Sequence, residues 1–288
     1  MDPLLSLMEI SKHCAQVGKQ ELNYLQAGSG PPVILIHGLL GGHFCWRLNI
    51  PALAERHTAF AIDLPGFGES VAPPTLDCSM QTQAARLLAW IEQLGLESVD
   101  LVAASWGGAV ALLLAGLTPR IRSLVLAAPV NPWSQFGRNR LRFFDGWTGR
   151  TLFRLGVPFS RPLHGVALKR LYGDPARIPP GALAGYSKMM MCPGRAENLL
   201  NTVHCWQSDL QALREAIERV QVPSLLIWGT RDGAVDIRSS DVLLAKLPVC
   251  ERAIIAGAGH LSFEETPEEF NRLVVDFLER VSAKSQPA

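Results

Sequence analysis

The chain has 288 residues, of which 48% are hydrophobic and 18% charged, a balance typical of a folded globular protein. Its formal net charge of +1 provides no general attraction to nucleic acid, and the sequence has no basic stripe interleaved with stacking aromatic residues. We therefore expect no nucleic-acid function.

The six cysteines are scattered along the chain without a Cys-x-x-Cys pair. This spacing favours reduced thiols over a disulfide framework or a zinc site. The apolar stretch from Leu4 to Ile10 lacks a basic leader and is too short to span a bilayer. We expect a cytoplasmic protein that needs no metal and no cofactor.

Continuous apolar runs recur along the chain, as expected for strands that are buried on both faces of a sheet. They occupy residues 33–36, 60–62, 99–103, 124–128, 224–228 and 253–255. Amphipathic stripes predict helices between and after them, over residues 84–94 and 270–281. Because parallel neighbours need a crossover helix, this alternation predicts an α/β fold with a mostly parallel central sheet flanked by helices.

The alternation is interrupted between residues 131 and 210. Aromatic residues, arginines and breakers such as Pro179-Pro180 replace the strand-like runs there. We interpret this segment as a helical cap inserted over the sheet edge. Residues 1–130 and 211–288 then form the core domain, and residues 131–210 form the cap.

Ser105 follows the apolar run 99–103 and precedes the small-residue stretch 109–117, so it stands at a strand-to-helix turn. A hydroxyl on such a turn projects above the sheet edge, where a base can reach it, and a small neighbour such as Gly107 lets the backbone bend. The alternative is a serine that only caps the helix.

A serine nucleophile needs a histidine base and an acid that orients it. Of the seven histidines, His260 lies in the loop Gly257-Ala258-Gly259-His260, after a strand-like run and before the last helix. Asp232 lies in the loop beyond the strand 224–228, at the same sheet edge. Asp236 is a rival acid, and we favour Asp232 because it is nearer the strand end.

The chain order Ser105, Asp232, His260 resembles that of the α/β-hydrolase superfamily, in the branch with a helical cap. Three more segments are similar to motifs of that family. They are residues 37–42 (HGLLGG), 63–70 (DLPGFGES) and 259–267, the histidine loop leading to the last helix. The resemblance covers about residues 12–130 and 210–282.

This resemblance implies a catalytic triad of Ser105, Asp232 and His260. It also implies an oxyanion hole formed by the backbone N–H groups of Leu39 and Trp106. His37, Gly38 and Gly107 would support these loops, and the turn 63–70 would stiffen a strand end. The family often has glycine where this chain has Ala103, and we expect the elbow to tolerate the extra methyl group.

Haloalkane dehalogenases and epoxide hydrolases of this fold carry aspartate at the position of Ser105. A serine instead attacks acyl carbons, so the sequence favours hydrolysis of a small-molecule carboxylic ester with an apolar acyl or aryl group. One alternative is a carbon–carbon bond hydrolase of a vinylogous diketone with the same triad. The other is a non-catalytic ligand-binding receptor of the same fold.

The first half of the cap is strongly basic and aromatic. Between Asn131 and Arg170 the only acid is Asp145. The basic residues are Arg138, Arg140, Arg142, Arg150, Arg154, Arg161, Lys169 and Arg170, and the aromatic residues are Trp133, Phe136, Phe143, Phe144, Trp147, Phe153 and Phe159. The simpler interpretation packs the aromatic side chains on the core domain, and the second makes this surface a contact for anionic lipid or an anionic substrate. The sequence leaves the oligomeric state open.

Overall fold

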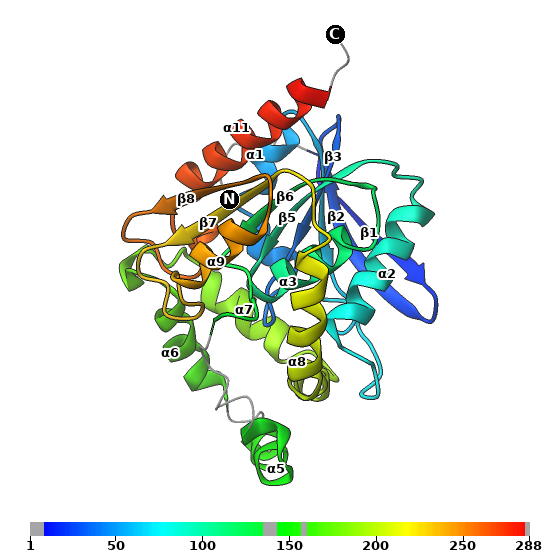
Figure 1. The fold of residues 1–288 in the computed structure, drawn as a ribbon. Helices are drawn as coiled ribbons and strands as arrows, with labels where there is room; N and C mark the ends of the chain where they lie inside the picture. Colours follow the sequence, from blue (N-terminus) through cyan, green and yellow to red (C-terminus); the bar gives the residue numbers. More distant parts are fainter. Residues whose placement is uncertain (1–8, 135–142, 157–159, 286–288) are drawn as a thin grey trace.

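The computed structural model describes residues 9–134, 143–156 and 160–285 (Figure 1). A central eight-stranded sheet has the order β1-β2-β4-β3-β5-β6-β7-β8. Its strands are β1 (Ser11–Val17), β2 (Gln20–Ala27), β3 (Pro32–Ile36), β4 (Thr58–Asp63), β5 (Val99–Ala104), β6 (Ile121–Ala127), β7 (Ser224–Gly229) and β8 (Cys250–Ile255). All neighbours from β4 to β8 pair in parallel, so the predicted α/β fold with a mostly parallel sheet is confirmed.

The first two strands are not among the predicted ones. β1 and β2 form a hairpin in which Val17 pairs with Gln20 across Gly18 and Lys19, and Gly18 has φ of +60°. β2 then pairs antiparallel with β4. β1 is the edge strand, and in both strands buried positions are interspersed with half-buried and exposed ones, which gives a weaker signal than a continuous apolar run.

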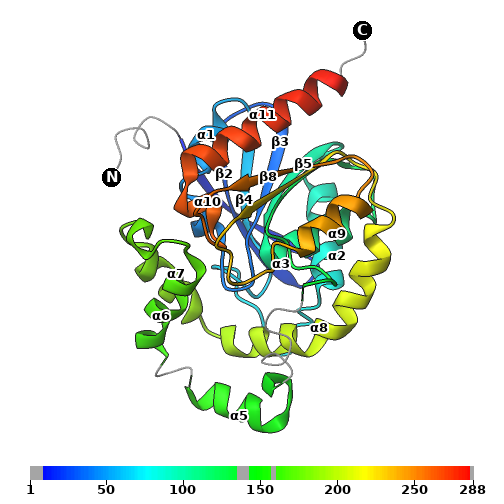
Figure 2. The ribbon, with the colours of Figure 1, turned by 60° about the vertical axis from the view of Figure 1, so that its left-hand side comes forward.

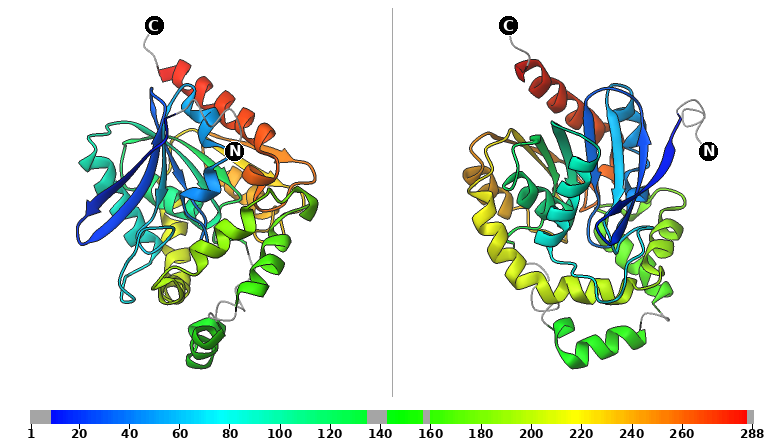
Figure 3. Two further views of the ribbon diagram at one scale, coloured as in Figure 1. Left: turned by 180° about the vertical axis from the view of Figure 1, so that it is seen from behind. Right: turned by 90° about the vertical axis from the view of Figure 1, so that its right-hand side faces the viewer.

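Helices cover both faces of the sheet (Figures 1 and 3). Along β3, Val33 and Leu35 pack in one core cluster, while Ile34 and Ile36 pack in the other. The cluster with Val33 and Leu35 includes residues of α1 (Ile50–Ala54) and α11 (Pro267–Ser285). The cluster with Ile34 and Ile36 includes residues of α2 (Met80–Gln93), α3 (Ser105–Ala115), α8 (Arg195–Ile217) and α9 (Ser239–Lys246). Short helices η2 (His43–Trp46) and α10 (Ser262–Glu265) complete this core.

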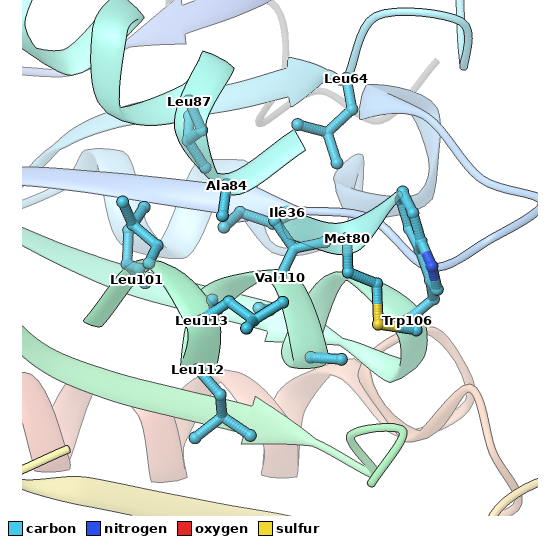
Figure 4. Packing of buried hydrophobic residues seen from close by; sticks show 14 of the residues in the cluster. Ile36, Leu64, Met80, Ala84, Leu87, Leu101, Trp106, Val110, Leu112 and Leu113 are labelled. Atoms are coloured by element: carbon cyan, nitrogen blue, oxygen red, sulfur yellow. The ribbon is translucent and has the colours of Figure 1, made fainter. Parts of the chain in front are cut away.

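The helix after Ser105 is apolar on all sides and lies within the core (Figure 4). Trp106, Val110 and Leu112 of α3 are fully buried, as are Ile36 of β3 and Met80 of α2. Because side chains of α3 pack against neighbours all around the helix, its N-terminus is held rigidly at the sheet edge.

Between β6 and β7 the chain forms α5 (Trp147–Gly156), α6 (Arg161–Leu171), η4 (Pro175–Arg177), α7 (Ala182–Met190) and α8. Figure 2 shows α5, α6 and α7 at one end of the molecule, away from α11. The boundary expected at residue 210 falls inside α8, since this helix continues to Ile217 and buries Leu213 and Ile217 in the core. The segment 131–210 that was expected to form a cap, called the cap below, therefore continues into the rest of the chain, called the core, within one helix. None of the described helices combines the length and the apolar character that crossing a bilayer requires.

Candidate active site

Ser105 joins the end of β5 to the start of α3 in a strained backbone conformation. Its φ is +52°, and Ala128 is the other non-glycine residue with positive φ among the described residues. Such strain is uncommon for a side chain with a Cβ and persists only where the surrounding structure imposes it. Here the extended Ala104 leads directly into the helix, so the turn presents Ser105 at the carboxyl edge of the sheet.

The residues around this turn have almost no free space. A Cβ atom on Gly107 would lie 2.2 Å from the carbonyl oxygen of His37, and one on Gly108 would lie 2.7 Å from Cβ of Pro129. Ala103 lies in regular β5, fully buried and paired with Ile36 and Leu126. The strand therefore accommodates the methyl group of Ala103, whereas the helix start requires glycine.

The structure brings Asp232 and His260 together. Asp232 follows β7 and His260 follows β8, and Oδ2 of Asp232 lies 2.9 Å from Nδ1 of His260. The other carboxylate oxygen of Asp232 accepts hydrogen bonds from the backbone N–H groups of Ala234 and Val235, at 2.7 and 3.0 Å. The Asp232 carboxylate is buried and fixed in place, as an orienting acid requires.

The rival acid Asp236 points elsewhere. Its carboxylate forms an ion pair with Arg238 at 2.7 Å, and this partner holds the pKa of Asp236 below its usual value. Because Asp232 bonds to His260 and Asp236 to Arg238, the geometry favours Asp232 as the acid.

Glu265, which the sequence analysis missed, anchors the loop that carries His260. Its carboxylate is fully buried and accepts backbone hydrogen bonds from Gly259 at 2.7 Å, from Gly173 at 2.9 Å and from Asp174 at 2.9 Å. The backbone N–H of His260 itself donates to the carbonyl of Leu171 at 2.7 Å. The histidine loop is therefore joined to the cap segment 171–174. The sequence signal that could have identified Glu265 is its position, five residues after His260 and just before the last helix.

His37 supports the loop on the other side of Ser105. Its Nε2 accepts a hydrogen bond from the backbone N–H of Leu64 at 3.2 Å, and Nδ1 donates to the carbonyl of Gly38 at 2.7 Å. Burial lowers the pKa of His37 to about 4, so the ring is neutral near pH 7. His37 thus acts on the loop through its hydrogen bonds and carries no charge into the site.

The loop after β3 passes close to the serine. A Cβ atom on Gly38 would lie 3.2 Å from Cβ of Ser105 and 3.8 Å from its Oγ. Leu39 comes next and lines the same pocket as Ser105. The backbone of residues 38–39 and the N-terminus of α3, where Trp106 lies, therefore flank the serine hydroxyl.

The turn 63–70 has a structural role. The buried carboxylate of Asp63 accepts backbone hydrogen bonds from His43 at 2.5 Å and from Glu69 at 2.7 Å, and Oγ of Ser70 donates to the carbonyl of Asp63 at 2.7 Å. Gly68 has φ of +54°, and a Cβ atom there would lie 2.0 Å from the Asp63 carboxylate. These contacts explain the presence of Asp63, Gly68 and Ser70 in the DLPGFGES pattern.

Ser105 and His260 line one pocket of about 360 Å³ between the core and the cap. The core contributes the loop 38–41, Cys45, Ala104, Ala234, Leu261 and Phe263, and the cap contributes His164, Ala167, Leu168, Leu171, Tyr186 and Met190. Most of these side chains are apolar. Of the three methionines in the run 189–191, Met190 reaches the pocket and Met189 is buried.

Tyr186 lines the pocket and contacts a buried carboxylate, that of Glu264. Its hydroxyl donates to Oε2 of Glu264 at 2.7 Å, and Glu264 is also paired with Arg47. Burial and the adjacent carboxylate raise the pKa of Tyr186 well above its ordinary value, so its hydroxyl stays protonated. In the part of the chain that the structure describes, no group of three or more His, Cys, Asp or Glu side chains could hold a metal ion.

Comparison with known proteins identifies relatives of this chain. The chain is 28% identical over 271 residues to the dihydrolipoyllysine-residue acetyltransferase component of the acetoin cleaving system of Pseudomonas putida, which covers 92% of the chain and 69% of that protein. It is 26% identical over 253 residues to the uncharacterized hydrolase YugF of Bacillus subtilis, covering 85% and 89%. A crystal structure of a membrane phospholipase A, described as a bacterial virulence factor, superposes with a TM-score of 0.76 at 26% identity, covering 95% of this chain and 87% of that one. The model of the alpha/beta hydrolase fold matches residues 31–267, and the chain therefore belongs to the α/β-hydrolase family.

Proposed function

We propose that this hydrolase cleaves carboxylic esters with an apolar acyl or aryl group, through an acyl-enzyme on Ser105. The observation that carries the proposal is the hydrogen bond between Asp232 and His260, in a loop beside a serine that is held at positive φ and faces the same pocket. An ionised carboxylate can only accept, so Nδ1 of His260 carries the proton and Nε2 is free to take one from Ser105.

The reaction then has two halves. His260 removes the hydroxyl proton of Ser105, Oγ attacks the ester carbonyl carbon, and the backbone N–H groups of Leu39 and Trp106 stabilise the oxyanion. His260 next protonates the leaving alcohol, and the acyl group remains on Ser105. Water activated by His260 attacks this acyl-enzyme, and the carboxylic acid leaves.

The pocket supports an apolar substrate. Its wall is formed mainly by aliphatic and aromatic side chains. Two of its polar side chains already have partners, since Tyr186 donates to Glu264 and His164 is hydrogen-bonded to Ser160 and Ser187. The name of the phospholipase that resembles this chain at 26% identity also fits ester chemistry. Serine in place of aspartate supports acyl transfer over the alkyl displacement of dehalogenases and epoxide hydrolases.

The test is hydrolysis of p-nitrophenyl esters of increasing acyl length by the wild type and by Ser105→Ala. We expect turnover by the wild type, with an optimum at acyl groups that fit about 360 Å³, and none by the variant. Ser98→Ala is the matched control, because this serine is exposed on the core domain and lies outside the pocket lining.

Two other outcomes would redirect the assignment. Cleavage of vinylogous diketones without ester turnover would identify a carbon–carbon bond hydrolase with the same triad. A stoichiometric phosphonate label on Ser105 with no turnover of either substrate class would favour a ligand-binding receptor.

A further inference from the structure

The cap exposes an unusual share of the large hydrophobic side chains. Of the twelve that are exposed among the described residues, seven lie between residues 143 and 183. They are Phe143, Trp147, Leu152, Leu155, Leu163, Val166 and Leu183. Scattered single residues of this kind are normal on a protein surface, but a concentration in one segment marks an interaction site.

Helix α5 carries the three most informative members of this group. Trp147 is 82% exposed, Leu152 is 54% exposed and Leu155 is 66% exposed. At about 100° per residue, these three positions fall within an arc of roughly 140° on one side of the helix. α5 therefore presents three large apolar side chains on one side to solvent, with Thr148 and Thr151 between them.

The opposite side of α5 is already occupied. Phe153 stacks edge-on against Phe144 with ring centroids 5.6 Å apart and packs against the core cluster, and Gly149 is buried. Arg154 forms an ion pair with Glu197 of α8 at 2.6 Å. An amphipathic helix normally turns its apolar side inward, whereas α5 is fixed to α8 with much of its apolar surface outward. Figures 1 and 2 show α5 as the outermost helix of the cap.

Most charged residues around this face are basic, and the two nearby acids are paired, Asp145 with His204 and Glu197 with Arg154. Helices α5, α6 and α7 contain six basic residues and no Asp or Glu. These are Arg150, Arg154, Arg161, Lys169, Arg170 and Lys188. On α6, the exposed Leu163 and Val166 share a side with Arg170, at positions i, i+3 and i+7. Of the other cap residues noted in the sequence, Arg138, Arg140, Arg142, Phe136 and Phe159 lie outside the described residues.

We propose that the exposed face of α5, together with the outer side of α6, binds an anionic lipid surface. Exposed Trp and Leu side chains bordered by Arg and Lys are what an interfacial helix needs, because the apolar groups enter the headgroup region while the cations remain at the phosphates. A protein partner would need an acidic patch that matches this face, whereas an anionic bilayer carries negative charge over its whole surface.

The test is co-sedimentation of the full chain with phosphatidylcholine vesicles, with and without phosphatidylglycerol, at low and at high salt. We expect binding only to the anionic vesicles, and less of it at high salt. We also expect a blue shift of tryptophan emission and quenching by brominated lipid. Both report on Trp147, because Trp46, Trp90, Trp106, Trp206 and Trp228 are buried and Trp133 is partly buried.

Two variants separate the apolar and the ionic contributions. Trp147→Ser/Leu155→Ser should reduce vesicle binding at least about tenfold, because each side chain removes apolar area that the bilayer would cover. Lys169→Gln/Arg170→Gln should weaken the salt dependence. Leu117→Ser/Val249→Ser is the matched control, since both residues are 54% exposed and lie on the core domain. All variants should keep the thermal unfolding temperature of the wild type within a few degrees.

Three results would overturn the proposal. One is equal binding to neutral and anionic vesicles, or none to either. Another is equal loss in the α5 variant and the control. The last is self-association that Trp147→Ser/Leu155→Ser abolishes, since a second copy of the chain would then cover this face.

Discussion

Oδ2 of Asp232 lies 2.9 Å from Nδ1 of His260, although the two residues follow different strands, β7 and β8. Parallel pairing of these strands brings both loops to the same edge of the sheet. The hydrogen bond fixes the tautomer of His260, and it holds the imidazole beside the pocket that Ser105 lines.

Replacing Asp232 by Asn should therefore impair the chemical step more than the fold. An amide can donate to Nδ1, which favours the tautomer with a proton on Nε2 and leaves Ser105 without a base. We expect kcat for ester hydrolysis to fall by about 10⁴-fold, the loss that the same change causes in serine proteases. Asp236→Asn is the control, because Asp236 pairs with Arg238, and its kcat should stay within about twofold. Equal losses in both variants would contradict the assignment of the acid.

Glu265→Gln tests whether the cap segment and the histidine loop are held together by one carboxylate. The glutamine retains one acceptor oxygen, so at least one of the three backbone N–H groups at Gly173, Asp174 and Gly259 loses its partner. Charged hydrogen bonds of this kind contribute about 2 kcal/mol each, and the free energy of unfolding should fall by about that amount.

Because Glu265 acts through Gly259 on the position of His260, kcat should fall about tenfold or more while KM changes little. The exposed Glu268→Gln, three residues further along, is the control and should alter neither quantity. A loss of stability with unchanged kcat would reduce Glu265 to a purely structural residue.

The sequence was most informative where one local pattern determines the structure. Ser105 could be placed on a strand-to-helix turn because a buried run precedes it and small residues follow it. The parallel strands were predictable since both of their faces are buried and their side chains form continuous apolar runs. Their order in the sheet was not, because nothing local specifies that β3 lies between β4 and β5.

The missed features depend on contacts between distant segments. Glu265 interacts with Gly173, 92 positions away, and its own neighbourhood in the sequence reads as an ordinary helix start. Trp147 belongs to an aromatic stretch, and the sequence favoured packing of such side chains on the core domain. Its 82% exposure follows from how α5 lies on α8, which only the folded chain defines.

Gly38→Ala tests how close the loop after β3 lies to Ser105, the proposed nucleophile. A methyl group at this position would lie 3.2 Å from Cβ of Ser105, closer than such atoms normally pack, so the loop or the serine must move. Leu39, whose N–H faces the developing oxyanion in the proposed reaction, would move with it. We expect kcat to fall at least about tenfold, in line with a weakened oxyanion hole.

The control for this change is Gly165→Ala in α6, where the nearest atoms to an added Cβ belong to Leu183 at 3.6 and 3.9 Å. This substitution should leave kcat unchanged, and it should stabilise the helix by about 1 kcal/mol. Unaltered kcat in Gly38→Ala would show that the loop does not take part in catalysis.

Asp209→Asn tests the cost of a buried carboxylate on α8. The Asp209 side chain is fully buried and accepts a hydrogen bond from the backbone N–H of Met80 at 3.0 Å, and burial raises its pKa to about 6. In the unfolded chain the pKa returns to about 4, so the native state alone retains a proton between these values and stability falls as pH rises through that window. Asparagine keeps an acceptor for Met80 and carries no charge.

We expect chemical denaturation to show Asp209→Asn more stable than the wild type by about 1–3 kcal/mol at pH 7.5, and nearly equal to it at pH 4. The exposed Asp276→Asn should show no such pH-dependent gain, and a loss of stability in Asp209→Asn at pH 7.5 would mean that the charge at the start of α2 is favourable.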